Sequence, residues 1–176
     1  MFNQIAKILK DGITSLFYDI DGNKRPKAKI ILFFVIIPIA FSLISLKVDK
    51  LYEIVDTLLT CLSIFTALIF TVLFIVPDKL TDRIKILKEK DDDATHDYLI
   101  RFYNFTKSFV KQISFVIVLS LALIILLIMQ KLYTCDILTF INSCLFVTLI
   151  FYVLIILSNM YILLMDDIER NGNEIK

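Results

Sequence analysis

Glycine and histidine are scarce in this chain of 176 residues, and each scarcity excludes a class of protein. The three glycines, Gly12, Gly22 and Gly172, lie outside the long apolar runs, so there is neither a phosphate-binding glycine loop nor a glycine-based contact between membrane helices. The single histidine, His96, has no Ser or Cys partner in a catalytic pattern. The three cysteines lack the spacing of metal ligands or redox pairs. The sequence therefore predicts a protein that is not an enzyme and uses no cofactor or metal.

Charge is nearly absent from four long apolar runs, which cover residues 30–46, 54–76, 112–130 and 137–165. Each run can cross a hydrocarbon core, which takes ~20 helical residues. With 58% hydrophobic residues and a mean hydropathy of +0.79, the composition excludes a soluble domain. The predicted fold class is all-α, a polytopic integral membrane protein with four transmembrane helices in a four-helix bundle. No charge lies at mid-membrane depth to couple an ion, which disfavours a transporter.

The positive charges predict the orientation of the chain. Of the 19 Lys and Arg residues, only Lys47, Lys50 and Lys131 lie in the first and third connections between the runs. The others lie in the N-terminal segment, the middle connection and the C-terminal tail, and Lys and Arg resist translocation. We therefore expect both termini and the middle connection in the cytoplasm. The net charge of +1 offers no basic field, so we expect the lipid bilayer, and no direct nucleic acid, as a partner.

The chain divides at its first apolar run. Residues 1–28 form a cytoplasmic N-terminal part, in which apolar residues at spacings of three and four predict an amphipathic helix followed by a turn. This helix either lies among the lipid headgroups or packs along the cytoplasmic ends of the other helices. Residues 29–176 form the four-span membrane domain, with a cytoplasmic hairpin at 77–111 and a short C-terminal tail.

The middle connection reads as a helical hairpin, because two apolar stripes at helical spacing face each other across a turn at Asp91, Asp92 and Asp93. A rigid projection with mixed charges is a candidate docking surface for a cytoplasmic protein. Its candidate residues are Asp91, Asp92, Asp93, His96, Arg101 and Lys107. The alternative is a simple connector that solubilises this side, with His96 as a solvated loop residue rather than a pH sensor or weak metal ligand.

Small and polar residues inside the runs predict where helices touch. Ser63, Ala67 and Thr71 follow one another at steps of four in the second run, a spacing suited to close helix contact. Asn142 and Asn159 lie in the fourth run and should face protein, because an amide inside hydrocarbon needs a hydrogen bond. These contacts lie within the bundle or between subunits of a homo-oligomer. The alternative is the lining of a hydrated pore.

Two features mark the outer connections. Glu53 and Asp56 share one helix face at the start of the second run, where they form either an interfacial ion-pair cluster with Lys47 and Lys50 or a cation-attracting ring in an oligomer. Cys135 is the plausible disulfide candidate, between subunits, because it lies in the third connection.

Two functions are compatible with these features. One is a membrane scaffold or sensor that self-associates and recruits a cytoplasmic effector, and the other is a homo-oligomeric pore that dissipates ion gradients. A continuous polar face along one span would favour the pore, and the second run shows such a face only in part. The scaffold interpretation is therefore preferred.

The long charged connection KLTDRIKILKEKDDDATHDYLIRFYNFTKSF between two pairs of apolar runs, in an Ile-, Phe- and Lys-rich chain, resembles the small four-span membrane subunits of bacterial antiphage systems, such as those of the Kiwa system. The resemblance covers the layout of the whole chain and includes no signature motif, so it transfers no functional residue. It implies a homo-oligomer in the bacterial inner membrane that responds to phage attack at the envelope. It also implies a cytoplasmic DNA-binding protein as partner.

Overall fold

The computed structural model describes residues 2–18, 24–48, 54–87, 93–133 and 135–174, and these residues are helical apart from short connections. The elements are α1 (Phe2–Leu16), α2 (Lys27–Ile31), the π-helical η1 (Leu32–Ile36), α3 (Ile37–Val48), α4 (Val55–Leu87), α5 (Asp93–Leu132) and α6 (Asp136–Glu174). Four segments are long and apolar enough to span a membrane: Lys27–Leu46, Val55–Ile75, Phe102–Leu132 and Asp136–Ile162. The prediction of an all-helical fold with four helices long and apolar enough to cross a membrane is confirmed for the described residues.

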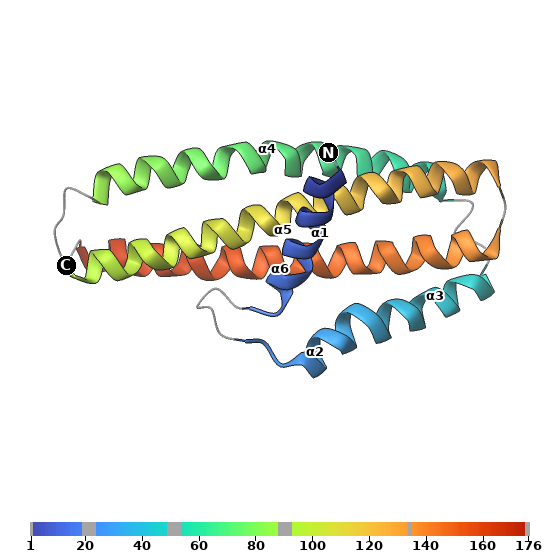
Figure 1. Cartoon of the computed structure of the whole chain (residues 1–176), viewed down its shortest axis with the longest axis horizontal. Helices are drawn as coiled ribbons and strands as arrows, with labels where there is room; N and C mark the ends of the chain where they lie inside the picture. The colour runs from blue at the N-terminus through green and yellow to red at the C-terminus, as the bar shows by residue number, and fades with distance from the viewer. Residues whose placement is uncertain (1, 19–23, 49–53, 88–92, 134, 175–176) are drawn as a thin grey trace.

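The four candidate spans form a row. α3 packs on α6, α6 on α5, and α5 on α4, so that α4 and α3 lie at opposite edges (Figure 1). Among the described residues, the four spans are therefore arranged as an open row and not as the closed four-helix bundle that the sequence predicts. The central position of α5 explains why it is the most buried of the four spans, whereas α4 at the edge is the least buried.

The core lies where α5 meets its neighbours. Val116 and Leu123 of α5 are fully buried, and Tyr152 of α6 packs its ring against Phe115 with ring centroids 4.5 Å apart. By contrast, α3 and α4 expose large apolar side chains such as Ile44 and Leu68. In a bilayer such side chains face lipid tails at no cost, because the tails are as apolar as they are.

The first span contains a π-helical turn just before Pro38. In a regular α-helix the proline ring would clash with the carbonyl of Phe34, and proline has no N–H to donate to it. The wider turn relieves this clash, and the N–H of Ile37 bonds instead to the carbonyl of Leu32. The hydroxyl of Ser42 donates to the carbonyl of Pro38 at 2.7 Å, just after the irregular turn.

α1 crosses the row instead of running along it, and it packs on α5 (Figure 1). Gly12 lies directly on the ring of Phe115, where a Cβ atom would overlap the ring. Next to it, Asp11 pairs with Lys111 of α5 at 3.6 Å. Because α1 runs across the spans, near Lys111 and Phe115 of α5, it lies roughly in the plane of a membrane that the spans would cross. The amphipathic helix predicted for this segment is therefore packed against the bundle, and Ile13 on its other side remains half exposed.

Candidate functional site

The buried and half-buried side chains that hydrogen-bond from one helical segment to another form two layers. The first layer consists of Arg25, Gln112 and Asn159. Arg25, just before α2, donates to the Oδ1 of Asn159 at 3.1 Å. The Nδ2 of Asn159 donates in turn to the Oε1 of Gln112 at 3.3 Å. This layer joins the start of the first span to α5 and α6.

The second layer lies at the other end of the row and consists of Ser45, Gln130, Thr139, Asn142 and Ser143. The Nδ2 of Asn142 donates to the Oε1 of Gln130 at 2.6 Å, and Gln130 donates through Nε2 to Thr139 at 3.0 Å. The hydroxyls of Ser45 and Ser143 bond to each other at 2.8 Å and connect α3 to α6. Asn142 and Asn159, which the sequence predicts to face protein, thus each bond to a glutamine of α5.

The two layers are separated by about the thickness of a membrane interior. At about 1.5 Å per residue, the rise from Gln112 to Gln130 is about 27 Å, against roughly 30 Å for a hydrocarbon core. Lys111 and Lys131 flank this segment on either side. Because α5 and α6 are antiparallel, a single register pairs Gln112 with Asn159 and Gln130 with Asn142. The layers therefore act as hydrogen-bonded crosslinks near both boundaries of the core.

Between the layers, the contact of α5 with α6 is mainly apolar. Leu123 and Leu127 are buried there, and Ser120 and Tyr152 are the polar exceptions at this depth. Two isolated hydroxyls do not form a hydrated path along a span. The described part of a single chain therefore has no polar channel through its core.

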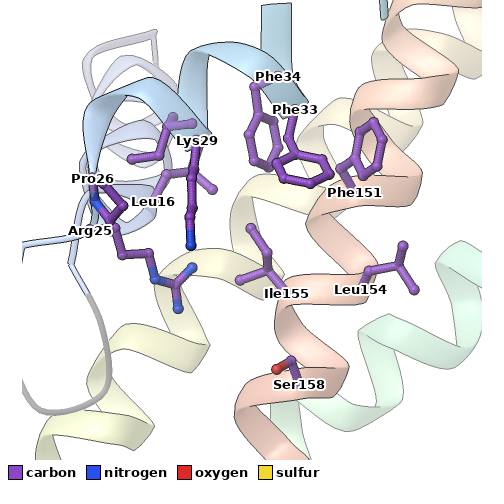
Figure 2. Close-up of a pocket in the computed structure, with 11 residues that line it drawn as sticks. Leu16, Arg25, Pro26, Lys29, Phe33, Phe34, Phe151, Leu154, Ile155 and Ser158 are labelled. Atoms are coloured by element: carbon purple, nitrogen blue, oxygen red, sulfur yellow. The ribbon is translucent and has the colours of Figure 1, made fainter. Parts of the chain in front are cut away.

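A groove with a volume of about 450 Å³ opens between the start of the first span and α6 (Figure 2). Arg25, Lys29 and Ser158 lie toward one end, and Phe33, Phe34 and Phe151 line the other. The ring of Phe151 packs edge-on against both other rings, with centroid distances of 5.4 Å to Phe33 and 6.2 Å to Phe34. The π-helical turn of η1 holds Phe33 and Phe34 in this wall.

Ser63, Ala67 and Thr71 of α4 are all exposed, so this face of α4 is not buried against another described helix of the chain. Ser63 donates to the carbonyl of Leu59 at 2.7 Å, and Thr71 to that of Ala67 at 3.1 Å. Their hydroxyls are thus satisfied by their own helix. What this face presents to its surroundings is a strip of small side chains.

At the start of α4, Asp56 pairs with Lys131 of α5 at 2.7 Å. The predicted ion-pair partners were Lys47 and Lys50. Lys50 and Glu53 lie outside the described residues, and so does the side chain of Lys47. Both partners of the observed pair are well exposed, so its contribution to stability is less than about 1 kcal/mol.

The candidate docking residues lie mostly beyond what the structure describes. Asp91 and Asp92 fall outside the described residues, Asp93 begins α5, and only the backbone of His96 and Arg101 is described. Lys107 is exposed on α5. Both α4 and α5 continue as helices beyond the apolar segments on this side, so the connection has a rigid helical base.

The three cysteines do not come together: Cys61 and Cys135 are exposed, Cys144 is half-buried, and each is a free thiol. Within the described residues, no group of three His, Cys, Asp or Glu side chains gathers around a common point. No protein-family model, curated protein or solved structure matches the chain.

The partners of the two asparagines were missed from the sequence. Gln112 and Gln130 lie at the ends of the third predicted span, and their spacing nearly equals that of Asn142 and Asn159. In two antiparallel helices, equal spacing lets both pairs meet in one register, and this was the available signal. The sequence marks Arg25 only as one of the positive charges that predict the orientation. Its bond to Asn159 depends on how the turn after α1 folds back, and hydropathy carries no information on that.

Proposed function

We propose that the chain is a non-enzymatic membrane scaffold or sensor subunit that self-associates in the bilayer and recruits a soluble effector. The observation that carries this proposal is the exposed strip of small side chains on α4, namely Ser63, Ala67 and Thr71. Exposed large apolar residues need no partner in lipid, but small residues at steps of four allow two helix backbones to approach closely. The strip lies on the least buried span, at one edge of the row.

The charged helical extension supports the recruitment of an effector. α4 continues beyond Ile75 to Leu87, and α5 begins at Asp93, so the connection stands on two helices rather than on an irregular loop. The distribution of Lys and Arg favours the cytoplasm for this side and for both termini. A soluble protein docked there is held at the membrane without any contact inside the lipid.

The resemblance in layout to Kiwa-type membrane subunits extends the proposal to a biological setting. In that setting the membrane is the bacterial inner membrane, the stimulus is phage attack at the envelope, and the effector is a DNA-binding protein. The chain itself then needs no affinity for nucleic acid, in keeping with its net charge of +1.

A homo-oligomeric pore is the second candidate, and one specific observation favours it. Thr60, Ser63 and Thr71 are all exposed on α4, with Asp56 at the end of the same helix. Several copies that bring these residues toward a common axis would line a path between them. Against this, each of the three hydroxyls donates to a carbonyl of its own helix, so only their acceptor lone pairs face the path.

Self-association is tested with a bulky residue in the strip. Ala67→Phe should reduce the oligomer to monomers in native mass measurements in mild detergent, because the ring keeps the backbones apart. Ala122→Phe is the matched control, since Ala122 is an exposed alanine of α5 between Gln112 and Gln130. An oligomer that tolerates Ala67→Phe as well as Ala122→Phe removes the strip from the proposal.

Recruitment is tested on the protein purified from native membranes together with the products of its own operon. A stoichiometric soluble protein on a homo-oligomer supports the scaffold, and reversal of Asp91, Asp92 and Asp93 to lysine should weaken its capture without affecting insertion. A homo-oligomer that carries no partner and conducts ions in liposomes favours the pore. Unchanged co-purification of the reversed variant removes the hairpin turn as the docking surface.

A further inference from the structure

Charged and apolar residues are segregated along the groove between the first span and α6 (Figure 2). At one end, Ser158 of α6 adjoins Asn159 of the first polar layer. At the other end, Phe151 lies about 10 Å further along α6, toward the middle of the span. The groove therefore runs from one boundary of the hydrocarbon core into its interior.

The charged end of the groove is positive. Figure 2 shows the side chain of Lys29 extending down from its helix, away from the phenylalanine rings, and the side chain of Arg25 extending across toward α6 below them. Lys24 and Lys27, both exposed, add to the positive charge of this segment. No Asp or Glu is among the described residues that line the groove. Arg25 is fixed by its bond to Asn159, and Lys29 is exposed at the mouth.

The apolar end of the groove suits a narrow, flexible chain. Phe33 and Leu154 on its two walls are each about half exposed, so the groove is open toward the surrounding lipid. Its volume of about 450 Å³ lies in the range of small-molecule sites and accommodates part of a lipid rather than a second helix.

We infer that this groove binds an anionic phospholipid, with the phosphate at Lys29 and Arg25 and one acyl chain along Phe33, Phe151 and Leu154. The charge of the mouth selects the headgroup, because a zwitterionic lipid brings a positive group toward Lys29 and an anionic one does not. A bound lipid would link the N-terminal segment to α6 across the first polar layer. This inference does not depend on self-association or on a soluble partner.

Lipid retained by the full-length protein tests the site. The protein is reconstituted in vesicles of equal phosphatidylglycerol and phosphatidylcholine, extracted in mild detergent and measured by native mass spectrometry. Lys29→Gln should lower retention of phosphatidylglycerol about fivefold, the factor that corresponds to about 1 kcal/mol for one lysine at a membrane surface. Leu154→Trp should lower retention of both lipids, because the indole fills the groove.

Two matched variants serve as controls. Lys107→Gln removes an exposed lysine of α5, and Leu157→Trp enlarges an exposed leucine of α6 outside the groove; both should retain lipid as the unaltered protein does. Equal retention of the two lipids by the unaltered protein, or no loss in Lys29→Gln and Leu154→Trp, overturns the inference. Loss of the oligomer in Leu154→Trp with lipid retention unchanged assigns the groove to a second copy and also overturns it.

The same spectra report the mass of the oligomer. Loss of lipid from an intact oligomer confirms the site and leaves the self-association of α4 as a separate question.

Discussion

Replacing Asn142 with leucine should weaken the contact between α5 and α6 at the second polar layer. Asn142 and Gln130 are 1% and 2% exposed, and the Nδ2 of Asn142 donates to the Oε1 of Gln130 at 2.6 Å. The substitution leaves that oxygen buried without its donor, which costs about 1–3 kcal/mol in a protein interior. In membranes the separated helices also find partners, and interhelical hydrogen bonds average about 0.6 kcal/mol with a maximum of about 1.7 kcal/mol. We expect a loss of about 1.5 kcal/mol.

A double-mutant cycle isolates the contribution of the pair. Gln130→Leu also removes the bond to Thr139, but that loss cancels when Gln130→Leu is compared with and without Asn142→Leu. The coupling free energy should be about 1 kcal/mol. The same cycle on Asn159 and Gln112 should give a smaller coupling, because their Nδ2–Oε1 distance is 3.3 Å.

The assay is reversible unfolding in mixed micelles with increasing dodecyl sulfate, followed by helical circular dichroism. Thr148→Val is the control, because the hydroxyl of Thr148 donates to Cys144 within α6 and so does not link two helices. It should change the unfolding free energy by less than about 0.5 kcal/mol. Zero coupling in both cycles would refute the view that the two layers crosslink α5 to α6.

Two further outcomes are expected. Gly12→Ala should release α1 from α5, because the added Cβ overlaps the buried ring of Phe115. Hydrogen exchange of the α1 amides should then accelerate. Lys10→Ala, on the exposed side of α1, should leave this exchange rate unchanged. In intact spheroplasts, a membrane-impermeant maleimide should label Cys135 when the other two cysteines are replaced by serine. In a variant without the native cysteines, the same reagent should label Lys107→Cys only after the membrane is permeabilised. The reverse pattern of labelling would contradict the orientation predicted from the lysines and arginines.

The irregular elements of the fold have physical causes that lie in single residues. Pro38 imposes the π-helical turn, and that turn holds Phe33 and Phe34 in the wall of the groove. Gly12 permits the close crossing of α1 over Phe115. Both residues are visible in the sequence, but the effect of Pro38 is local, whereas the effect of Gly12 depends on Phe115 of another helix. A glycine in an amphipathic helix does not reveal, from the sequence alone, which ring of another helix it will contact.

The candidate site was predictable only in part. The hydrophobicity of the surroundings requires a polar partner for Asn142 and Asn159, and this requirement can be stated from the sequence alone. The sequence does not show which residue is that partner, because the answer depends on the register of two helices that are adjacent for reasons of packing. The groove was not predicted at all. It exists because Arg25 and Lys29 precede a span that packs on α6, and neither hydropathy nor spacing reports that neighbour.

The sequence by itself determined that the chain is helical and that four of its segments are long and apolar enough to cross a membrane, because hydropathy is summed over consecutive residues and each span must satisfy its own backbone hydrogen bonds. Only the tertiary structure decided that the spans form a row with α5 inside and α4 at the edge, that Asp56 pairs with Lys131, and that α1 crosses Phe115. These features depend on contacts between residues far apart in the sequence. In lipid such contacts are selected by shape and by hydrogen bonds rather than by hydrophobicity, since every apolar face is equally acceptable to the solvent.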